Sequence, residues 1–155
     1  MKIKILTISK TKSEYADAEA EFLKRLTKST HVEIVNLKEE PITHNRAIDE
    51  IMDKEGDRIL KNLDKDYYNI ALHVMGKAIS SEELSNLIKE IKDFKGGKIC
   101  FIIGGPLGLS QQVLTKVNLV LSFSRMTLTH QLIRLLLLEQ IYRSFEIIKG
   151  SDYHK

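Results

Sequence analysis

Cysteine, proline, tryptophan and long apolar runs are scarce in this sequence of 155 residues, which has one cysteine, two prolines and no tryptophan. The single thiol, Cys100, cannot form a disulfide within the chain and lies in an apolar run, so we expect a core residue of a cytoplasmic protein. The leucine run near the C-terminus is bounded by Arg134 and Glu139, so we expect no membrane span and no membrane partner. The first ten residues also lack the apolar region of a secretory signal.

Sequence motifs for metal binding, phosphate binding and hydrolysis are also missing. The histidines, at positions 31, 44, 73, 130 and 154, have no ligand spacing with one another or with Cys100, so we expect no metal. No G-x-S-x-G elbow occurs. The glycine-rich stretch at residues 104–110, GGPLGLS, matches neither the P-loop nor the G-x-G-x-x-G pattern. These absences disfavour nucleophilic hydrolysis, metal catalysis and ordinary dinucleotide binding.

Charge is small in total but unevenly distributed. The formal net charge is +3, yet residues 31–66 carry a local charge of −4, and residues 98–129 contain three basic residues and no acidic one. Such asymmetry is typical of a protein with one face toward a polyanion, and an ordinary solvated surface explains it equally well. If RNA is the partner, we expect contacts from residues 98–129 and from Lys10 and Lys12.

Strand-like and helical patterns alternate along the chain. Five segments are typical of strands: residues 2–8, 32–38, 68–74, 98–105 and 118–124. Helices are predicted at residues 13–28, 45–63 and 80–94, followed by a short helix from Ser110 and a long one after Thr129. Ser13, Ser81 and Thr129 are the expected N-caps. The alternation predicts a single α/β domain over residues 1–155, with a mostly parallel sheet covered by helices.

Three loops follow the carboxyl ends of predicted strands, where parallel sheets bind ligands. They are residues 72–77, 104–110 and 123–129. Each loop taken alone is explained at least as well by a structural turn or a buried connection. The third loop has neither glycine nor proline, and its free backbone groups could hold a flat heterocycle such as adenine better than a phosphate.

Four segments together resemble a known family: LHVMGKAISSEEL, FIIGGPLGL, LSFSRMTLTHQLIRLLLLEQIYRSFEIIKG and the terminal YHK. In this order and spacing they are similar to the RlmH family, small bacterial methyltransferases of the SPOUT class that act on 23S ribosomal RNA. The resemblance covers the whole chain. It implies S-adenosyl-L-methionine as the methyl donor and N3 of a pseudouridine in helix 69 as the acceptor, with the assembled ribosome as the expected substrate. It also implies a homodimer and a C-terminal trefoil knot, which the rarity of knots would otherwise disfavour.

The resemblance further implies which residues form the site. The expected cofactor contacts are Leu72, Gly104, Gly105, Phe123, Ser124, Arg125, Met126, Thr127 and Leu128. In the family the C-terminal tail completes the active site beside the cofactor of the partner subunit. The tail residues Tyr153 and His154, with Arg143, are therefore the expected catalytic residues. His154 is the candidate base, Arg143 the candidate electrostatic stabiliser, and Tyr153 a residue that stacks on the acceptor base or orients it.

Three positions depart from the family pattern. His73 stands where aspartate is usual, Ser9 where glycine is common, and Asp152 where proline usually precedes Tyr-His. The first departure changes the local charge near the expected cofactor, and the last removes a rigid residue from the tail.

The last helix combines leucines with charged and polar residues. Apolar side chains surround it over residues 132–148, so we expect nearly complete burial, partly by another subunit. His130 and Arg134 share a face, and Glu139 and Arg143 could pair. Except for Arg143, we expect structural roles for these residues.

Two rival functions remain open at this point. One is a non-catalytic, ribosome-associated RNA-binding protein of the same fold. The other is a nucleotide- or nicotinamide-dependent enzyme of ordinary doubly wound topology, against which the missing glycine fingerprint argues.

Overall fold

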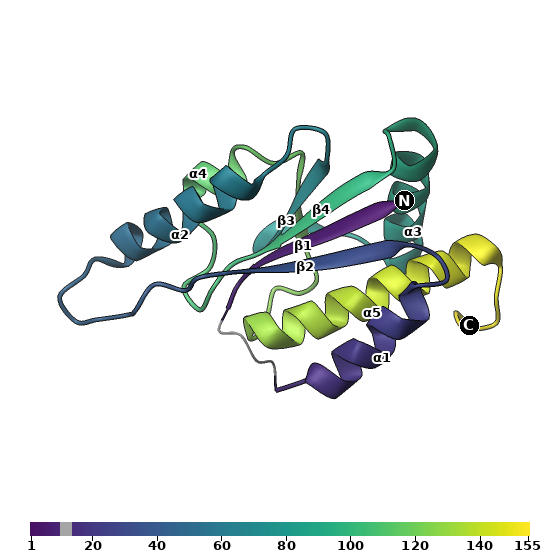
Figure 1. Cartoon of the computed structure of the whole chain (residues 1–155), viewed down its shortest axis with the longest axis horizontal. Coiled ribbons are helices and arrows are strands. Elements are labelled where there is room, and N and C mark those ends of the chain that lie inside the picture. Colours follow the sequence, from purple (N-terminus) through teal and green to yellow (C-terminus); the bar gives the residue numbers. More distant parts are fainter. Residues whose placement is uncertain (10–13) are drawn as a thin grey trace.

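The computed structural model describes residues 1–9 and 14–155 and forms a single α/β domain (Figure 1). Its strands are β1 (Lys2–Ile8), β2 (His31–Leu37), β3 (Tyr68–Ala78), β4 (Lys98–Ile103) and β5 (Leu119–Ser122). Its helices are α1 (Ala16–Leu26), α2 (Ile48–Asn62), α3 (Ser81–Phe94), α4 (Gln111–Leu114) and α5 (His130–Lys149). The strand order is β2-β1-β4-β3-β5, and every pairing among these five strands is parallel. The predicted fold class is therefore confirmed.

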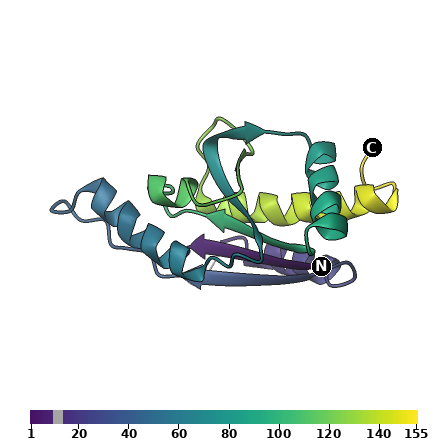
Figure 2. The same ribbon diagram turned by 90° about the horizontal axis from the view of Figure 1, so that it is seen from above.

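A hydrophobic core lies on each face of the sheet, and the two cores together bury strand β4 on both sides. Ile99 and Phe101 point to the face covered by α1, α3 and α5, whereas Cys100 and Ile102 point to the face covered by α2 and α4 (Figures 1 and 2). Cys100 is 1% exposed, and burial raises the pKa of its thiol to about 12. The prediction that this cysteine is a core residue is confirmed.

The observed N-caps agree with the sequence in one case and differ by one residue in another. The Thr129 side chain accepts a hydrogen bond from the backbone N–H of Leu132 at 3.3 Å and caps α5 as predicted. Ser81 does not cap α3, because Ser80 accepts from the N–H of Glu83 at 3.2 Å and the Glu83 carboxylate accepts from the N–H of Ser80. The third predicted cap, Ser13, lies outside the described residues.

Strand β3 is longer than predicted and contains a bulge. Leu72 and Lys77 both pair with Leu121 of β5, so residues 73–76 are extra residues between two paired segments. Gly76 is required there, since a Cβ atom would lie 2.6–2.8 Å from backbone atoms of Leu121. The predicted strand end at residue 74 was wrong because the bulge interrupts the apolar pattern.

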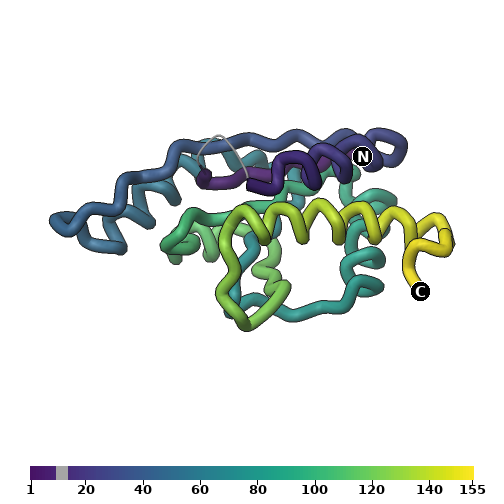
Figure 3. The backbone as a smooth tube through the Cα atoms, turned by 90° about the horizontal axis from the view of Figure 1, so that it is seen from below, coloured from purple at the N-terminus to yellow at the C-terminus, as the bar shows by residue number. Residues whose placement is uncertain are grey.

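Helix α5 connects opposite ends of the molecule. It begins at the carboxyl edge of the sheet and, with 20 residues, is about 30 Å long. Gly150, with a φ of 70°, ends it at the edge where the strands begin, and the C-terminal tail follows there (Figures 1 and 3). In the part of the chain that the structure describes, no helix is long and apolar enough to cross a membrane.

Candidate functional site

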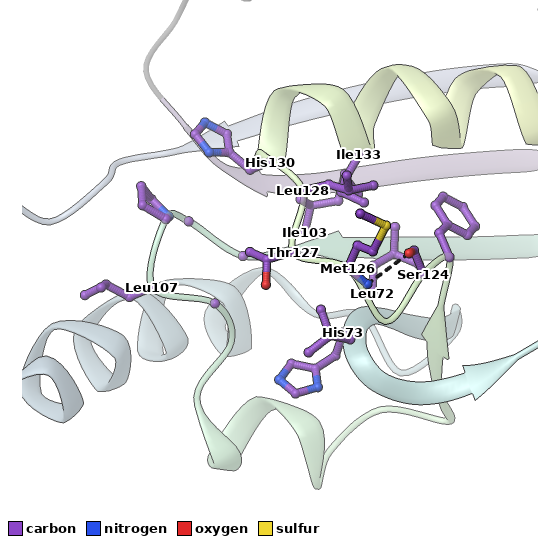
Figure 4. Close-up of a pocket in the computed structure, with 16 residues that line it drawn as sticks. Leu72, His73, Ile103, Leu107, Ser124, Met126, Thr127, Leu128, His130 and Ile133 are labelled. Atoms are coloured by element: carbon purple, nitrogen blue, oxygen red, sulfur yellow. Dashed lines mark hydrogen bonds between the residues drawn. The ribbon is translucent and has the colours of Figure 1, made fainter.

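A pocket of about 250 Å³ opens at the carboxyl ends of β3, β4 and β5 (Figure 4). The three loops that were selected from the sequence all contribute to its wall, together with the start of α5. Eight of the nine expected cofactor contacts line it: Leu72, Gly104, Gly105, Phe123, Ser124, Met126, Thr127 and Leu128. The ninth, Arg125, is exposed and does not line it. Ile103 and Ile133, which lie outside the three loops, also form the wall, and so does His130, for which a structural role was expected.

The glycine-rich turn after β4 needs its glycines for close packing. A Cβ atom on Gly104 would lie 2.7 Å from the backbone of Gly108, and one on Gly105 would lie 2.9 Å from Cγ2 of Ile8 and 3.0 Å from Oε2 of Glu55. The Gly108 N–H donates to the Gly105 carbonyl at 3.0 Å. The segment is thus a tight turn and also a wall of the pocket, so the two interpretations of its sequence are compatible.

Hydrogen bonds of side chains to the backbone hold the segment after β5, which has no glycine or proline. The Ser124 hydroxyl accepts from the N–H of Met126 at 2.9 Å. The Ser122 hydroxyl lies 2.9 Å from the Ser124 carbonyl and 3.1 Å from the Val74 carbonyl, so it can donate to either and links the segment to the β3 bulge. Within the described residues, the N–H groups of residues 127 and 128 make no hydrogen bond. These main-chain donors remain available to a ligand.

The pocket is neutral and largely apolar. Among the described residues that line it, none is an aspartate, glutamate, lysine or arginine. Burial lowers the pKa of His130, so this imidazole is uncharged at neutral pH. The Nδ1 atom of His73 accepts from the N–H of Met75 at 3.2 Å. Apolar walls with free main-chain groups suit a flat heterocycle better than a phosphate.

The three expected catalytic residues come together at the other end of α5. The Arg143 guanidinium pairs with Glu139 through Nε at 3.0 Å and Nη2 at 2.6 Å, and the Tyr153 hydroxyl donates to the same carboxylate at 3.2 Å. Arg143 Nη1 lies 3.3 Å from Nδ1 of His154, whose Nε2 lies 2.8 Å from Oε1 of Glu82. We call these five residues the tail cluster.

Hydrogen-bond geometry assigns the tautomer of His154, and local hydrogen bonds and burial shift the pKa values of Glu82 and Tyr153. A guanidinium has only donors, so His154 Nδ1 accepts from Arg143 and Nε2 carries the proton that Glu82 accepts. Hydrogen bonds from its own backbone N–H, Ser80 and His154 lower the pKa of Glu82 to about 2. Burial and the Glu139 carboxylate raise the pKa of Tyr153, so the phenol stays protonated at neutral pH.

The sequence indicated only part of this cluster. The spacing of four between Glu139 and Arg143 predicted their pairing, which the structure contains. The contact of Glu82 with His154 joins residues 72 positions apart and left no local signal. The pocket lies at the start of α5 and the tail cluster toward its C-terminal end, so about 20 Å of helix separates His130 from Arg143 within one chain.

The remaining polar residues of α5 have structural partners. Arg134 is 6% exposed and pairs with Glu19 of α1 at 2.9 Å and with Asn36 of β2 at 3.2 Å. The Ser9 hydroxyl donates to the same Asn36 oxygen, so the departure at this position joins the network. Gln140 accepts from the Ser81 hydroxyl at 2.7 Å. One strip of the helix stays uncovered in the single chain, where Leu136 is 36% exposed.

The residues expected to contact RNA do not form one face. Lys98 begins β4 and Arg125 follows β5, so they lie at opposite ends of a parallel sheet. Lys98 also lies 3.5 Å from the carboxylate of Asp66. Lys10 and Lys12 lie outside the described residues. In the described ranges, no three side chains of histidine, cysteine, aspartate or glutamate come close enough to hold a metal ion.

Comparisons with known proteins agree with the motif resemblance. A family model described as "Predicted SPOUT methyltransferase" matches residues 1–154. The ribosomal RNA large subunit methyltransferase H of Halothermothrix orenii is 48% identical, and that of Bacillus pumilus is 43% identical, with complete coverage of both chains in each case. A solved structure of a probable methylase family protein from Haemophilus influenzae Rd KW20 has a TM-score of 0.57 at 16% identity. It covers 99% of this chain and 70% of that chain and shows a shared fold.

Proposed function

Because the chain belongs to the RlmH family of SPOUT methyltransferases, we propose that it transfers a methyl group from S-adenosyl-L-methionine to N3 of a pseudouridine in helix 69 of 23S ribosomal RNA. We propose the assembled ribosome as its substrate. The observation that carries the proposal is the pocket at the ends of β3, β4 and β5, which has no charged side chain among its described lining residues and which eight of the nine expected cofactor contacts line. Membership in this family argues against the rival nucleotide- or nicotinamide-dependent enzyme of ordinary doubly wound topology.

The pocket residues fit the proposed cofactor. The free N–H groups of residues 127 and 128 are suited to the edge of adenine, and Leu72, Leu128 and Ile133 to its faces. The turn at Gly104 and Gly105 offers a backbone without side chains for close approach. When bound, S-adenosyl-L-methionine supplies a sulfonium-activated methyl group for in-line displacement, so the chain mainly aligns the reactants and excludes water.

The tail cluster supplies the chemistry for the acceptor in this proposal. The acceptor N3 carries a proton that must leave before or during methyl transfer. Arg143 turns from His154 toward the uracil carbonyl, which stabilises the developing negative charge and frees Nδ1 of His154 to take the proton. Glu82 then stabilises the imidazolium through Nε2, while Glu139 keeps Arg143 and Tyr153 in place. Tyr153 orients the acceptor base by stacking.

The proposal requires a second copy of the chain. His130 of the pocket and Arg143 of the tail cluster lie 13 residues apart on α5, which is about 20 Å of helix and too far for direct transfer within one chain. A homodimer with antiparallel α5 helices would bring each tail to the pocket of the partner subunit. The uncovered strip of α5 around Leu132 and Leu136 supports this arrangement. A trefoil knot around the pocket is part of the same proposal.

The test is incubation with labelled S-adenosyl-L-methionine and 70S ribosomes, free subunits or naked 23S rRNA from cells that lack the modification. We expect label in 23S rRNA from 70S ribosomes, and N3-methylpseudouridine after digestion to nucleosides. Label in another nucleoside would refute the acceptor, and calorimetric binding of the cofactor without any transfer would favour the non-catalytic RNA-binding protein.

A further inference from the structure

A second hollow, of about 610 Å³, lies between the C-terminal end of α1 and the start of β2, at the edge opposite the cofactor pocket. Lys24, Lys28 and His31 line it, together with the hydroxyl-bearing residues Thr27 and Ser29. Among the described residues of its wall, none is acidic. The hollow therefore combines positive charge with small hydroxyl groups, which is the set of side chains that contacts phosphates in nucleic-acid complexes.

The charges of this hollow are not neutralised within the chain. Lys24, Lys28 and His31 are exposed, and within the described residues none of their side chains has an ion-pair or hydrogen-bond partner. The neighbouring Arg25, by contrast, pairs with Glu21 at 2.8 Å. Lys24 lies in the last turn of α1 and Lys28 in the turn that follows the helix, and both line the hollow, so two ammonium groups without an acidic partner among the described residues face the same space.

An exposed aromatic side chain lies on the same edge. Phe94, at the end of α3, is 83% exposed. Met1 lies between the hollow and the segment that follows α3, since the Met1 carbonyl accepts from the Thr30 hydroxyl at 3.1 Å and the Met1 Cα lies 3.9 Å from the Cβ position of Gly97, three residues after Phe94. An aromatic ring beside lysines is the usual combination in proteins that bind single-stranded nucleic acid, where the ring stacks on a base.

The edge is also next to the tail cluster. The Arg25 guanidinium lies 5.7 Å from the Tyr142 ring, which packs edge-on against Tyr153 at 4.9 Å between centroids. Figure 3 shows the N-terminus, the α1–β2 turn and the C-terminal tail at one end of the molecule. A strand of RNA held at this edge would therefore pass the residues proposed to act on the acceptor base.

We propose that Lys24, Lys28, His31 and Phe94, together named the basic edge, bind an unpaired stretch of the substrate RNA. The two lysines contact phosphates and Phe94 stacks on a base. The inference rests on the proposed function for the identity of its substrate. It differs from the sequence-based expectation, which assigned RNA contacts to residues 98–129 and to two lysines outside the described residues.

The test measures binding of purified 70S ribosomes to Lys24→Gln/Lys28→Gln at several potassium chloride concentrations. The matched control is Lys61→Gln/Lys65→Gln, which removes the same charge at the same spacing from the last turn of α2 and the turn that follows it, and α2 covers the opposite face of the sheet. For the test variant we expect affinity to fall on the order of tenfold in 0.1 M salt, and the slope of log K against log salt to become shallower by about 1.4 to 1.8. The control should retain wild-type values.

Two further variants separate charge from stacking. Lys24→Arg/Lys28→Arg should keep wild-type affinity, because the positive charge is retained. Phe94→Ala should weaken binding by roughly 5- to 150-fold without changing the salt slope. All variants should bind S-adenosyl-L-methionine and melt like the wild type, because the changed residues are exposed and remote from the pocket.

Unchanged affinity and salt slope in Lys24→Gln/Lys28→Gln, or an equal loss in the control pair, would overturn the basic edge. The proposed function is judged separately by methyl transfer from wild-type protein. If the wild type methylates 23S rRNA while the basic-edge variants bind ribosomes normally, only this inference fails.

Discussion

The ion pair between Arg134 and Glu19 should be a major determinant of stability. Their side chains are 7% and 8% exposed, so replacement of Glu19 by glutamine leaves the guanidinium nearly buried without a counter-charge. Removing one partner of a buried pair costs about 3–5 kcal/mol. For a chain of this length, that loss corresponds to a fall in Tm of about 9–15 °C.

The assay is thermal unfolding of Glu19→Gln, Arg134→Met and the double variant Glu19→Leu/Arg134→Met, at equal protein concentration because dimerisation would shift Tm. Each single variant should be destabilised by about 3–5 kcal/mol. The double variant should recover much of this loss, since replacing both charges with apolar groups is often close to neutral. Affinity for S-adenosyl-L-methionine should be preserved in the folded variants. A single variant that melts within about 2 °C of the wild type would refute the reasoning, because the pair would then contribute little.

Three further predictions concern the site. Deleting residues 153–155 should abolish methyl transfer to ribosomes and leave cofactor affinity unchanged in calorimetry, and unchanged methylation would contradict a role of the tail. Gly105→Ala should weaken cofactor binding at least about tenfold, because its Cβ atom would clash with Ile8 and Glu55. Gly96→Ala, where no atom lies within 4 Å and the φ of 77° strains only a turn remote from the pocket, should bind the cofactor normally. Burial raises the pKa of Glu55, so its ionisation opposes folding as pH rises above the ordinary value. The stability of Glu55→Gln relative to wild type should therefore increase from pH 4 to pH 7 in urea unfolding, and a constant difference would contradict the shift.

The alternation of strands and helices was predictable from the sequence because each element shows its own apolar period. The same reasoning failed at β3, where Gly76 and Lys77 interrupt the pattern while the chain continues to pair with β5. It also selected Ser81 instead of Ser80, since either serine could precede the acidic first turn and only Ser80 has Glu83 at the distance that a capping box needs.

The candidate site was predictable to the extent that topology determines it. Parallel strands place their following loops at one edge, so three loops chosen from the sequence line one pocket. The partners of the tail were not predictable, because Glu82 reaches His154 across the tertiary structure. The partner of Arg134 was missed for the same reason, since Glu19 lies 115 positions earlier in the chain.

The separation of pocket and tail along α5 has a consequence for genetics. In the proposed homodimer each chain donates a pocket to one site and a tail to the other, so two differently defective chains can complement each other. A chain with an impaired pocket, paired with a chain that lacks its tail, would form one site from two defective halves and one from two intact halves. Mixed dimers would then regain up to half of the activity that neither parent possesses.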